Sequence, residues 1–523
     1  MTISRPLLTL PFAIALLWAQ FQESGNPALH ARLTLAAEPQ MPVRVYLFKD
    51  GRPFRLSPVD VTLPLRVDSF YRERLWTRSA KPATLEVTCR DQSHFLLLNG
   101  AGSFNLPAGK YRVEAYRGFF YTPAMEEFEL KAGEERRVSL RLSNWAAAES
   151  ENWIAADDHI HLTRELQDND VFLRWMEAED LQVANFLQLQ RQMDAAVQYA
   201  FGTKGEARKE RSAIRSGHES RSEFYGHLNL LGGRELIRPL SAGSMYANSP
   251  EAYPYPAVLF AKGHSIGAIV GYAHFSGSMP HSALLMDLAL GNIDFVEVLQ
   301  FGILKSTEWY ELLNAGLRVT GVAGSDFPVM LNRAGQLPRT VPLLGPERTL
   351  VKAQGAGSPY ELWAAGVKAG TAMVSNGPLV EITVDESTSS VTTKARYGRE
   401  IERLEIVRNG QVIAFALGNG QKSLAVSARF AEGESCWIAA RVSARKSEGE
   451  PDIVGHTNPV YVVRNGQPFF NKMARQAVAA KWGAELDYYR SVGLVFPSEQ
   501  LRRDFFEQAE KALAILRNPP ARL

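Results

Sequence analysis

Cysteine is scarce in this sequence. The chain has two cysteines in 523 residues, Cys89 and Cys436, and it contains no Cys-x-x-Cys pair. A zinc site built from thiolates needs several cysteines at short spacing, so that kind of site is excluded. Because the two cysteines lie far apart in the sequence, both a single disulfide in an oxidising compartment and two free thiols agree with them.

An excess of either charge is also missing. The chain has 58 Lys and Arg residues against 56 Asp and Glu residues, which gives a formal net charge of +2. No long basic block is present, so the sequence indicates neither a nucleic-acid partner nor a polybasic membrane-binding surface. The length predicts about two to four folded domains, and the hydrophobic fraction of 46% is ordinary for globular proteins.

Apolar runs long enough to span a membrane are absent after the N-terminus. Near the N-terminus, Arg5 precedes an apolar run at residues 7–19 that is short for a bilayer span, which is typical of an export signal. We therefore predict a signal peptide and leader over residues 1–37, with cleavage at Ala19 or at Ala36-Ala37, and a periplasmic or extracellular location. No stable membrane span is expected after cleavage, and an uncleaved N-terminal anchor is the alternative.

The hydrophobic pattern changes along the chain and predicts several modules. Short alternating runs with turn signals predict an N-terminal β-sandwich over residues 38–148 and a second β-sandwich over residues 379–465. Between them, over residues 149–378, apolar strand-like runs alternate with helix-like segments, which indicates a parallel sheet in a barrel or a doubly wound fold. These runs are 153–158, 182–187, 222–230, 267–273, 293–299, 317–323 and 370–375. A helical segment is expected over residues 466–523.

Histidine is concentrated in the middle unit, where seven of the ten histidines lie between His159 and His281. The motif His159-x-His161 ends an apolar strand, and residues two apart on a strand point to the same side. Both imidazoles would then face one point, which suits a shared divalent metal. A chance pair on a solvated strand end agrees equally well with this motif alone. Asp158 should point away from the metal, in a structural role.

Further His, Glu and Asp residues stand beside the other predicted strands. Glu219 and His227 flank the start of one strand, whereas His274 and Asp326 each follow an apolar run. Parallel α/β barrels build their active site at the C-terminal ends of the strands, so this convergence predicts a metal site. The candidate ligands are His159, His161, Glu219, His227, His274 and Asp326. We expect Glu219 and Asp326 to be catalytic as well, with Glu219 able to bridge two ions and Asp326 able to act as a general base.

These motifs resemble, in their order and spacing, the successive motifs of the PHP (polymerase and histidinol phosphatase) superfamily across about residues 152–377. The runs Ala156-Asp157-Asp158-His159-Ile160-His161 and Val374-Ser375-Asn376-Gly377-Pro378 are similar to the CehA/McbA-type metallohydrolases, a branch named for carbamate-hydrolysing members. The resemblance implies a distorted (β/α)7 barrel that carries divalent ions, usually zinc, manganese or iron, and β modules around the catalytic unit.

The chain departs from the family pattern in two places. The family commonly has Thr-Asp-His after its second strand, where this chain has Leu187-Gln188-Leu189. Its final motif usually reads Gly-Ser-Asp-x-His, whereas this chain has Gly324-Ser325-Asp326-Phe327-Pro328. We therefore expect one or two ions, the latter sharing Glu219. Gln188 could replace the missing ligands as a weak ligand or as a hydrogen-bond donor.

The predicted function is that of a metal-dependent hydrolase. It would use a metal-activated water to cleave an ester-type bond of a small molecule, either a phosphoester, a carboxyl ester or a carbamate. Arg339 is a candidate for neutralising an anionic substrate, and the basic segment 202–222 beside Glu219 is expected to be a solvated loop, with a substrate lid as the alternative. Two other functions agree with the sequence: a catalytically inactive PHP-like barrel that acts as a secreted binding protein, and a carbohydrate- or surface-binding protein that uses its β modules. The sequence predicts no oligomeric state.

Overall fold

A computed structural model describes most of the chain. It covers residues 30–56, 61–64, 84–89, 93–146, 150, 152–162, 164, 166–188, 202–237, 251–276, 279–327 and 338–518. Residues 1–29, which make up most of the predicted leader, lie outside the described residues. Residues 30–37, which the prediction assigned to the end of the leader, form most of strand β1 (His30–Glu38). Ala36 and Ala37 are each 3% exposed, and cleavage there would remove this strand from its sheet.

The N-terminal part is built from two sheets with a shared hydrophobic core. Its strands are β1, β2 (Pro42–Lys49), β3 (Arg52–Pro53), β4 (Val61–Pro64), β5 (Thr84–Cys89), β6 (Ser93–Asn99), β7 (Ala101–Pro107), β8 (Gly109–Tyr116), β9 (Tyr121–Thr122), β10 (Ala124–Leu130), β11 (Glu135–Arg141) and β12 (Ser143–Asn144). One sheet has the order β11-β1-β7 and the other β10-β8-β2-β6-β5-β4. Leu33 and Leu35 of the first sheet and Val45 and Val113 of the second belong to one buried cluster, so the two sheets pack face to face.

The middle part mixes strands and helices around the site described below. Its strands are β13 (Trp153–Ile160), β14 (Val183–Gln188), β15 (Ala207–Lys209), β16 (Ser212–Ser222), β17 (Gly226–Leu231), β18 (Ile269–Tyr272), β19 (Phe295–Gln300), β20 (Ile303–Leu304), β21 (Thr320–Ala323), β22 (Arg348–Lys352) and β23 (Met373–Ser375). Its helices are α2 (Asn169–Ala178), α3 (Gly202–Gly205), α4 (Pro256–Ser265), α5 (Leu284–Leu290), α6 (Ser306–Asn314) and α8 (Pro359–Ala369), with 3-10 turns η3 (Leu166–Asp168) and η5 (Ala273–Ser276).

The sheet of the middle part is mixed, so the predicted all-parallel barrel is not confirmed. The pairs β13–β14, β14–β16, β18–β19 and β19–β21 are parallel, whereas β16–β17, β17–β18 and β13–β22 are antiparallel. The reason lies in the run 222–230, which we predicted as one strand. It contains the end of β16, a turn and β17, and the turn reverses the chain. A parallel bridge between Ile160 and Phe327 nevertheless brings the chain after β21 back beside β13.

Local sequence signals fix the helix that covers β13 and β21. Helix α8 begins with a capping box, because the Ser358 hydroxyl accepts from Glu361 N at 3.3 Å while the Glu361 carboxylate accepts from Ser358 N at 2.9 Å. It ends at Gly370, which adopts φ 70°, a left-handed conformation that glycine adopts without strain. Trp363 and Val367 of α8 pack in one cluster with Ile154 of β13 and Val322 of β21, which covers the sheet on this face.

The C-terminal part continues the middle sheet and adds a second one. Strand β23 pairs with β30 (Ile453–Thr457), which leads through β29 (Cys436–Ala444) and β26 (Ile401–Arg408) to β27 (Gln411–Leu417), while β31 (Val460–Val462) pairs with β29. The second sheet has the order β24 (Leu379–Asp385), β25 (Ser390–Arg396) and β28 (Ser423–Arg429). Cys436 is a buried free thiol in this part, and the side chain of Cys89 lies outside the described residues.

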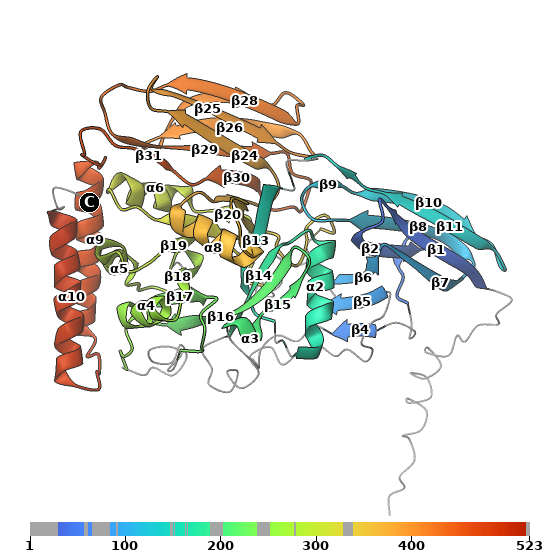
Figure 1. Ribbon diagram of the computed structural model, residues 1–523, viewed down its shortest axis with the longest axis horizontal. Helices are drawn as coiled ribbons and strands as arrows, with labels where there is room; N and C mark the ends of the chain where they lie inside the picture. Colours follow the sequence, from blue (N-terminus) through green and yellow to red (C-terminus); the bar gives the residue numbers. More distant parts are fainter. Residues whose placement is uncertain are drawn as a thin grey trace, which may run out of the picture.

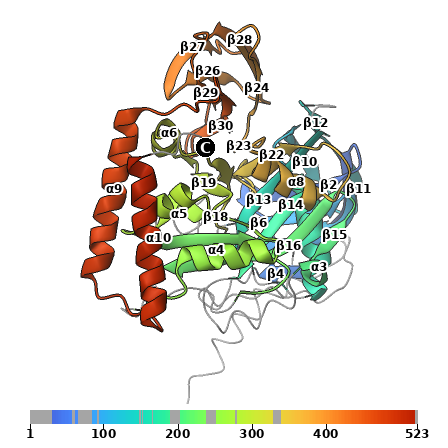
Figure 2. The same ribbon diagram turned by 60° about the vertical axis from the view of Figure 1, so that its left-hand side comes forward.

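Two long helices, α9 (Lys472–Ser491) and α10 (Glu499–Arg517), end the described chain. They stand side by side at the opposite end of the molecule from the N-terminal sheets (Figures 1 and 2). Trp482 and Tyr489 of α9 and Phe505 of α10 belong to one buried cluster with Tyr225 and Met286 of the middle part. Among the described residues, no helix combines the length and the apolar character needed to cross a membrane.

Candidate metal centre

The end of β13 presents two histidines to the interior of the middle part. His159 is fully buried and His161 is 1% exposed, and their Nε2 atoms lie 3.0 Å apart. Ile160 between them belongs to a hydrophobic cluster with Phe172 and Phe186, as strand alternation requires. Alternation therefore sends the apolar residue into the core and both imidazoles to a common point.

Glu219 of β16 stands between two pairs of histidines. Its Oε2 lies 3.3 Å from His161 Nε2 and 3.8 Å from His159 Nε2. Its Oε1 lies 2.9 Å from His227 Nδ1 and 3.5 Å from His274 Nε2. The two oxygens of one buried carboxylate thus face different histidine pairs, an arrangement that can bridge two cations.

Asp326 completes the cluster from the loop after β21. Its Oδ1 lies 3.1 Å from His161 Nε2 and 3.6 Å from His159 Nε2, and its Oδ2 lies 3.8 Å from His274 Nε2. Asp326 has φ 50°, and His274 and Phe275 have φ 53° and 52°, which is a left-handed conformation that side chains other than glycine rarely adopt. Such strain, of order 1–3 kcal/mol per residue, persists only where the surrounding structure fixes the backbone. Here it occurs at Asp326 and His274, two of the six clustered residues.

The structure brings together all six side chains that the sequence singled out as metal ligands. Three overlapping groups of them have potential ligand atoms within 4.8 Å of one another: His159, His161 and Glu219; His159, His274 and Asp326; Glu219, His227 and His274. Ligands that stand 2.0–2.1 Å from a tetrahedral zinc ion lie about 3.3–3.4 Å from each other. The distances that join His159 Nε2 and His161 Nε2 to each other, to Glu219 Oε2 and to Asp326 Oδ1 run from 3.0 to 3.8 Å, which is compatible with a small cation between them.

Hydrogen bonds at the far side of three rings fix which nitrogen faces the cluster. His159 Nδ1 lies 2.7 Å from Glu297 Oε1, His161 Nδ1 lies 3.2 Å from the Leu187 carbonyl, and His274 Nδ1 lies 2.6 Å from Gln300 Oε1. Each partner is an acceptor, so each Nδ1 carries a hydrogen, and each ring presents a lone pair on Nε2 once that nitrogen has lost its proton. Three Nε2 atoms that face two carboxylates need positive charge among them, which protons or a metal ion can supply.

Sequence reasoning missed the residues that orient these rings. Glu297 of β19 is 1% exposed, and besides His159 it accepts from the backbone N–H of His274 at 2.7 Å and from Asn229 Nδ2 at 2.9 Å. Gln300 Nε2 donates to the same carboxylate at 3.3 Å. A signal was available, because a lone glutamate in an otherwise apolar buried strand must have a partner.

The charges of the cluster shift the pKa values of its members. Burial alone would lower the pKa of His159, but Glu297 and Asp326 raise it well above its ordinary value. Burial would likewise raise the pKa of Asp326, but the histidines, with His159 first, hold it below its ordinary value. Arg221, which donates to Glu219 Oε2 at 2.6 Å, and His227 hold the pKa of Glu219 well below its ordinary value against burial. Both cluster carboxylates are therefore ionised and able to act as ligands.

Asp157 fastens the segments that carry these ligands. Its Oδ1 accepts from the backbone N–H groups of His159 and Ser325 at 3.1 and 3.0 Å. Its Oδ2 accepts from the Ser325 hydroxyl at 2.6 Å and from Gly345 N at 3.0 Å. One buried carboxylate therefore sets the end of β13 against the loop that carries Asp326.

The remaining predicted residues lie elsewhere. Arg339 does not join the cluster: its guanidinium pairs with Glu114 of β8 at 2.6 Å, and its role in substrate binding stays a prediction. Gln188, at the end of β14, is 3% exposed and pairs in register with His218, and its Oε1 has no hydrogen-bond partner among the described residues. Asp158 is buried outside the ligand groups. Residues 202–222 form α3, β15 and the buried β16, and are not a solvated loop.

Comparisons with known proteins do not place the chain in a family. No family model matches the sequence, and no curated protein matches it. A search of solved structures finds Endonuclease Q in complex with a 27-mer duplex substrate that has an abasic lesion at the active site, at 14% identity and a TM-score of 0.28. The match covers 42% of this chain and 57% of that chain, so it spans little more than half of the other protein. A likeness this distant assigns no activity.

Proposed function

We propose that this protein is a metal-dependent hydrolase that cleaves an ester-type bond. The observation that carries the proposal is the meeting of the Nε2 atoms of His159, His161 and His274 with the carboxylates of Glu219 and Asp326 in one buried site. Imidazole and carboxylate ligands suit zinc, manganese and iron, and we propose one of these as the resident ion. The resemblance of the motifs to the CehA/McbA-type branch of the PHP superfamily agrees with this proposal.

The cluster supports a site for two ions that share Glu219. Glu219 Oε2 belongs with His159, His161 and Asp326, whereas Oε1 belongs with His227 and His274. A divalent cation bound here supplies Lewis acidity and lowers the pKa of water towards neutrality. Asp326, held ionised by the histidines, can accept a proton from that water at a carboxylate oxygen.

Arg221 favours phosphoesters among the ester substrates. Its side chain is 12% exposed, and its Nε donates to Glu219 Oε2, so it sets a guanidinium beside the proposed ions. A cation at this position complements an anionic phosphoryl group better than a neutral carbamate or carboxyl ester. We therefore propose a phosphoester as the substrate, with an aryl carbamate as the next compound to test.

The experiment combines metal counting with a substrate panel. The chain is purified without chelators, its metal content is measured by mass spectrometry, and a phosphomonoester, a phosphodiester, an aryl ester and an aryl carbamate are assayed. His159→Ala is expected to lose both metal and turnover. His264→Ala is the matched control, because His264 is 37% exposed and pairs with Asp294 at 3.0 Å, outside the ligand groups.

Three outcomes would contradict different parts of the proposal. Full metal content and full turnover in His159→Ala would contradict the proposed metal site. Stoichiometric metal with no turnover of any of the four substrates would support the metal site but contradict the hydrolase activity. Turnover of the aryl carbamate alone would support the hydrolase activity but contradict the proposal that the substrate is a phosphoester.

We also propose that the protein is exported. The support is the charge of Arg5 and the apolar run that follows it. The test is to express the full chain with a C-terminal tag, fractionate the cells and sequence the N-terminus of the exported form. Because residues 30–37 belong to a sheet, cleavage is expected before His30. Protein that stays in the cytoplasm with its N-terminus intact would contradict export.

A further inference from the structure

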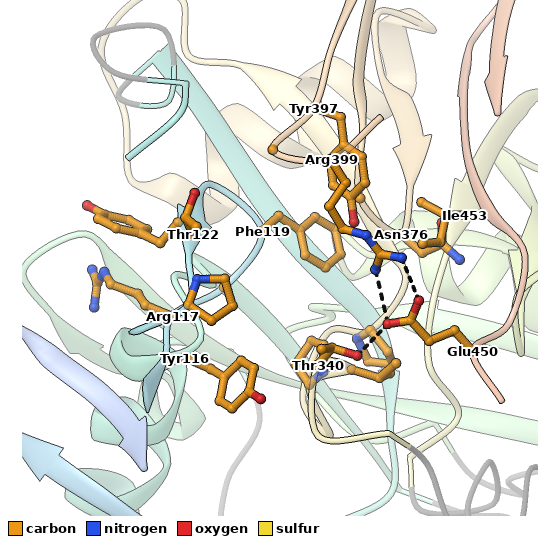
Figure 3. A pocket seen from close by; sticks show the side chains of 18 of the residues that line it. Tyr116, Arg117, Phe119, Thr122, Thr340, Asn376, Tyr397, Arg399, Glu450 and Ile453 are labelled. Carbon is orange, nitrogen blue, oxygen red and sulfur yellow. Dashed lines mark hydrogen bonds and ion pairs between the residues drawn. The ribbon is translucent and has the colours of Figure 1, made fainter. Parts of the chain in front are cut away.

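A cavity lies where the three parts of the chain meet. Its volume is about 140 Å³, and its lining comes from the N-terminal part, the segment that follows residue 338 and the C-terminal part (Figure 3). None of its lining residues belongs to the ligand groups of the metal centre. Cavities at the junctions of modules are common places for small-molecule sites.

Aromatic rings form much of the wall. Phe119, Trp145 and Tyr397 line the cavity, and the rings of Trp145 and Tyr397 meet edge to face with centroids 5.9 Å apart. Two glycines let these rings lie directly on the backbone. A Cβ at Gly398 would stand 2.6 Å from Trp145 Cδ1, and one at Gly377 would stand 2.9 Å from Tyr397 Cζ. The family-like run Ser375-Asn376-Gly377 thus contributes to this wall, and Asn376 itself lines the cavity.

The charged residues of the lining are already neutralised. Arg399 binds both oxygens of Glu450, with Nη1–Oε1 and Nη2–Oε2 distances of 3.0 and 2.7 Å (Figure 3). Arg117 donates to the Pro42 carbonyl at 2.7 Å and pairs with Asp180 at 3.6 Å. A charged ligand would have to break these pairs, so the cavity selects an uncharged one.

One residue of the lining, Glu347, has a buried polar atom that lacks a partner. Glu347 is 3% exposed; its Oε1 accepts from Gly302 N at 2.7 Å, and its Oε2 has no hydrogen-bond partner within the described part of the chain. Burial raises the pKa of Glu347 to about 8, so the carboxyl holds a proton at neutral pH. Because Oε1 accepts from Gly302 N, the proton belongs on Oε2. The resulting O–H group is a buried donor without a partner, and a ligand with a hydrogen-bond acceptor would satisfy it.

We propose that this cavity binds an uncharged single-ring aromatic molecule whose hydrogen-bond acceptor meets Glu347. A cavity of about 150 Å³ accommodates a benzene-sized ring, which agrees with the volume here. The ring would pack against Phe119, Trp145 and Tyr397, and the acceptor, such as a carbonyl oxygen, would receive the Oε2 hydrogen. The site is independent of the proposed hydrolase activity, because it shares no residue with the metal centre.

The test uses acetophenone, which has one ring and one carbonyl acceptor, and toluene, which has the ring alone. Both are titrated into the full chain by calorimetry and by ligand-observed nuclear magnetic resonance. Saturable binding of both compounds at one site is expected. Glu347→Leu is expected to weaken acetophenone about tenfold and to leave toluene within threefold, because only acetophenone uses the donor. Glu347→Gln keeps a donor and an acceptor, so acetophenone binding is expected to stay within threefold.

A filling substitution tests the location without removing a polar group. Val341→Trp places an indole in the cavity and is expected to abolish binding of both compounds, since Val341 lines it. Val412→Trp is the matched control, because Val412 is 40% exposed on β27, outside the lining. No saturable binding to the unmodified chain, or unchanged binding to Val341→Trp, would overturn the proposal. Equal losses of toluene and acetophenone in folded Glu347→Leu would overturn the role of Glu347.

Discussion

Two neighbouring aspartates of β13 should differ in how much the fold is destabilised when each is replaced with asparagine. Asp157 and Asp158 are both fully buried. Asp157 accepts four hydrogen bonds, two of them from Ser325. Neither carboxylate oxygen of Asp158 has a partner within the described part of the chain. Replacing each in turn with asparagine keeps the shape of the side chain and removes one acceptor.

The expected cost follows from the number of acceptors that each site uses. In Asp157→Asn the new amide nitrogen cannot accept, so two of the four donors lose their acceptor. If the amide takes the Oδ2 position, the Ser325 hydroxyl can reverse and accept from it, which leaves only Gly345 N unsatisfied. Burial raises the pKa of Asp157, and its hydrogen bonds, with that of Ser325 first, oppose this effect. Leaving one buried donor unsatisfied costs about 1–3 kcal/mol, so the free energy of unfolding should fall by about that amount.

Asp158→Asn should not destabilise the fold. Burial, and then Glu297, raise the pKa of Asp158 well above its ordinary value, so this carboxyl is costly to ionise. Asparagine removes that cost and breaks no hydrogen bond, and the change in unfolding free energy should stay within about 1 kcal/mol or be stabilising. A side chain larger than asparagine at position 158 would not test this point, because Asp158 packs directly against the backbone of Gly324 and a larger group would clash there.

The assay is urea unfolding of both variants with a chelator present, so that folding is measured apart from metal binding. A separate titration with zinc measures metal affinity, which should fall about tenfold in Asp157→Asn, because this residue positions both His159 and the loop of Asp326. The same titration should be unchanged in Asp158→Asn. Equal destabilisation of the two variants, or a greater loss in Asp158→Asn, would refute the reasoning.

Three further results are expected. Glu297→Gln should lower zinc affinity about 10–100-fold in a competitive chelator titration, because it weakens the acceptor for His159 Nδ1. Glu405→Gln, another buried glutamate, should bind zinc normally, and equal losses would contradict a specific role. Zinc at a hundredfold excess over its Kd should raise the unfolding free energy by about 2.7 kcal/mol, and a similar rise in His159→Ala would argue against this site. Burial raises the pKa of Glu347 from its ordinary value of 4.5 to about 8, so its contribution to stability is full below pH 4.5 and lost as the pH rises through 8. The chain should lose roughly 3–5 kcal/mol over that window, and urea midpoints of Glu347→Gln should lack this loss.

The clustered residues could be predicted because each one follows a simple rule of strand geometry. His159 and His161 are two residues apart on β13, and alternation alone places them together. His274 and Asp326 follow short apolar strands, β18 and β21, whose parallel neighbour is β19 in both cases. Glu297 escaped prediction because it lies inside β19, where an apolar pattern directs attention to the core.

The errors in the fold have a different origin. Strand β16 is polar in sequence and buried in the structure, so hydropathy alone could not find it. Its polar side chains are satisfied by partners that no local pattern reveals: Arg215 pairs with Glu206, and Ser216 accepts from Arg164 at 2.9 Å. The missed strand turned the predicted parallel order into a mixed one, because β17 returns antiparallel to β16.

The charge balance of the cluster argues for a divalent cation more strongly than the number of histidines does. Glu219, Glu297 and Asp326 are buried together, with Arg221 beside Glu219, and burying carboxylates costs several kcal/mol each unless opposite charges compensate them. Without a metal, protons supply part of the compensation. Asp326 and Glu219 raise the pKa of His161 against the effect of burial, as the nearby carboxylates do for His159. A ligand imidazole must be neutral, so a bound cation would replace these protons. The departures from the pattern that the sequence resembles remove possible ligands at Gln188 and Pro328 but leave the carboxylates that create this demand for a cation.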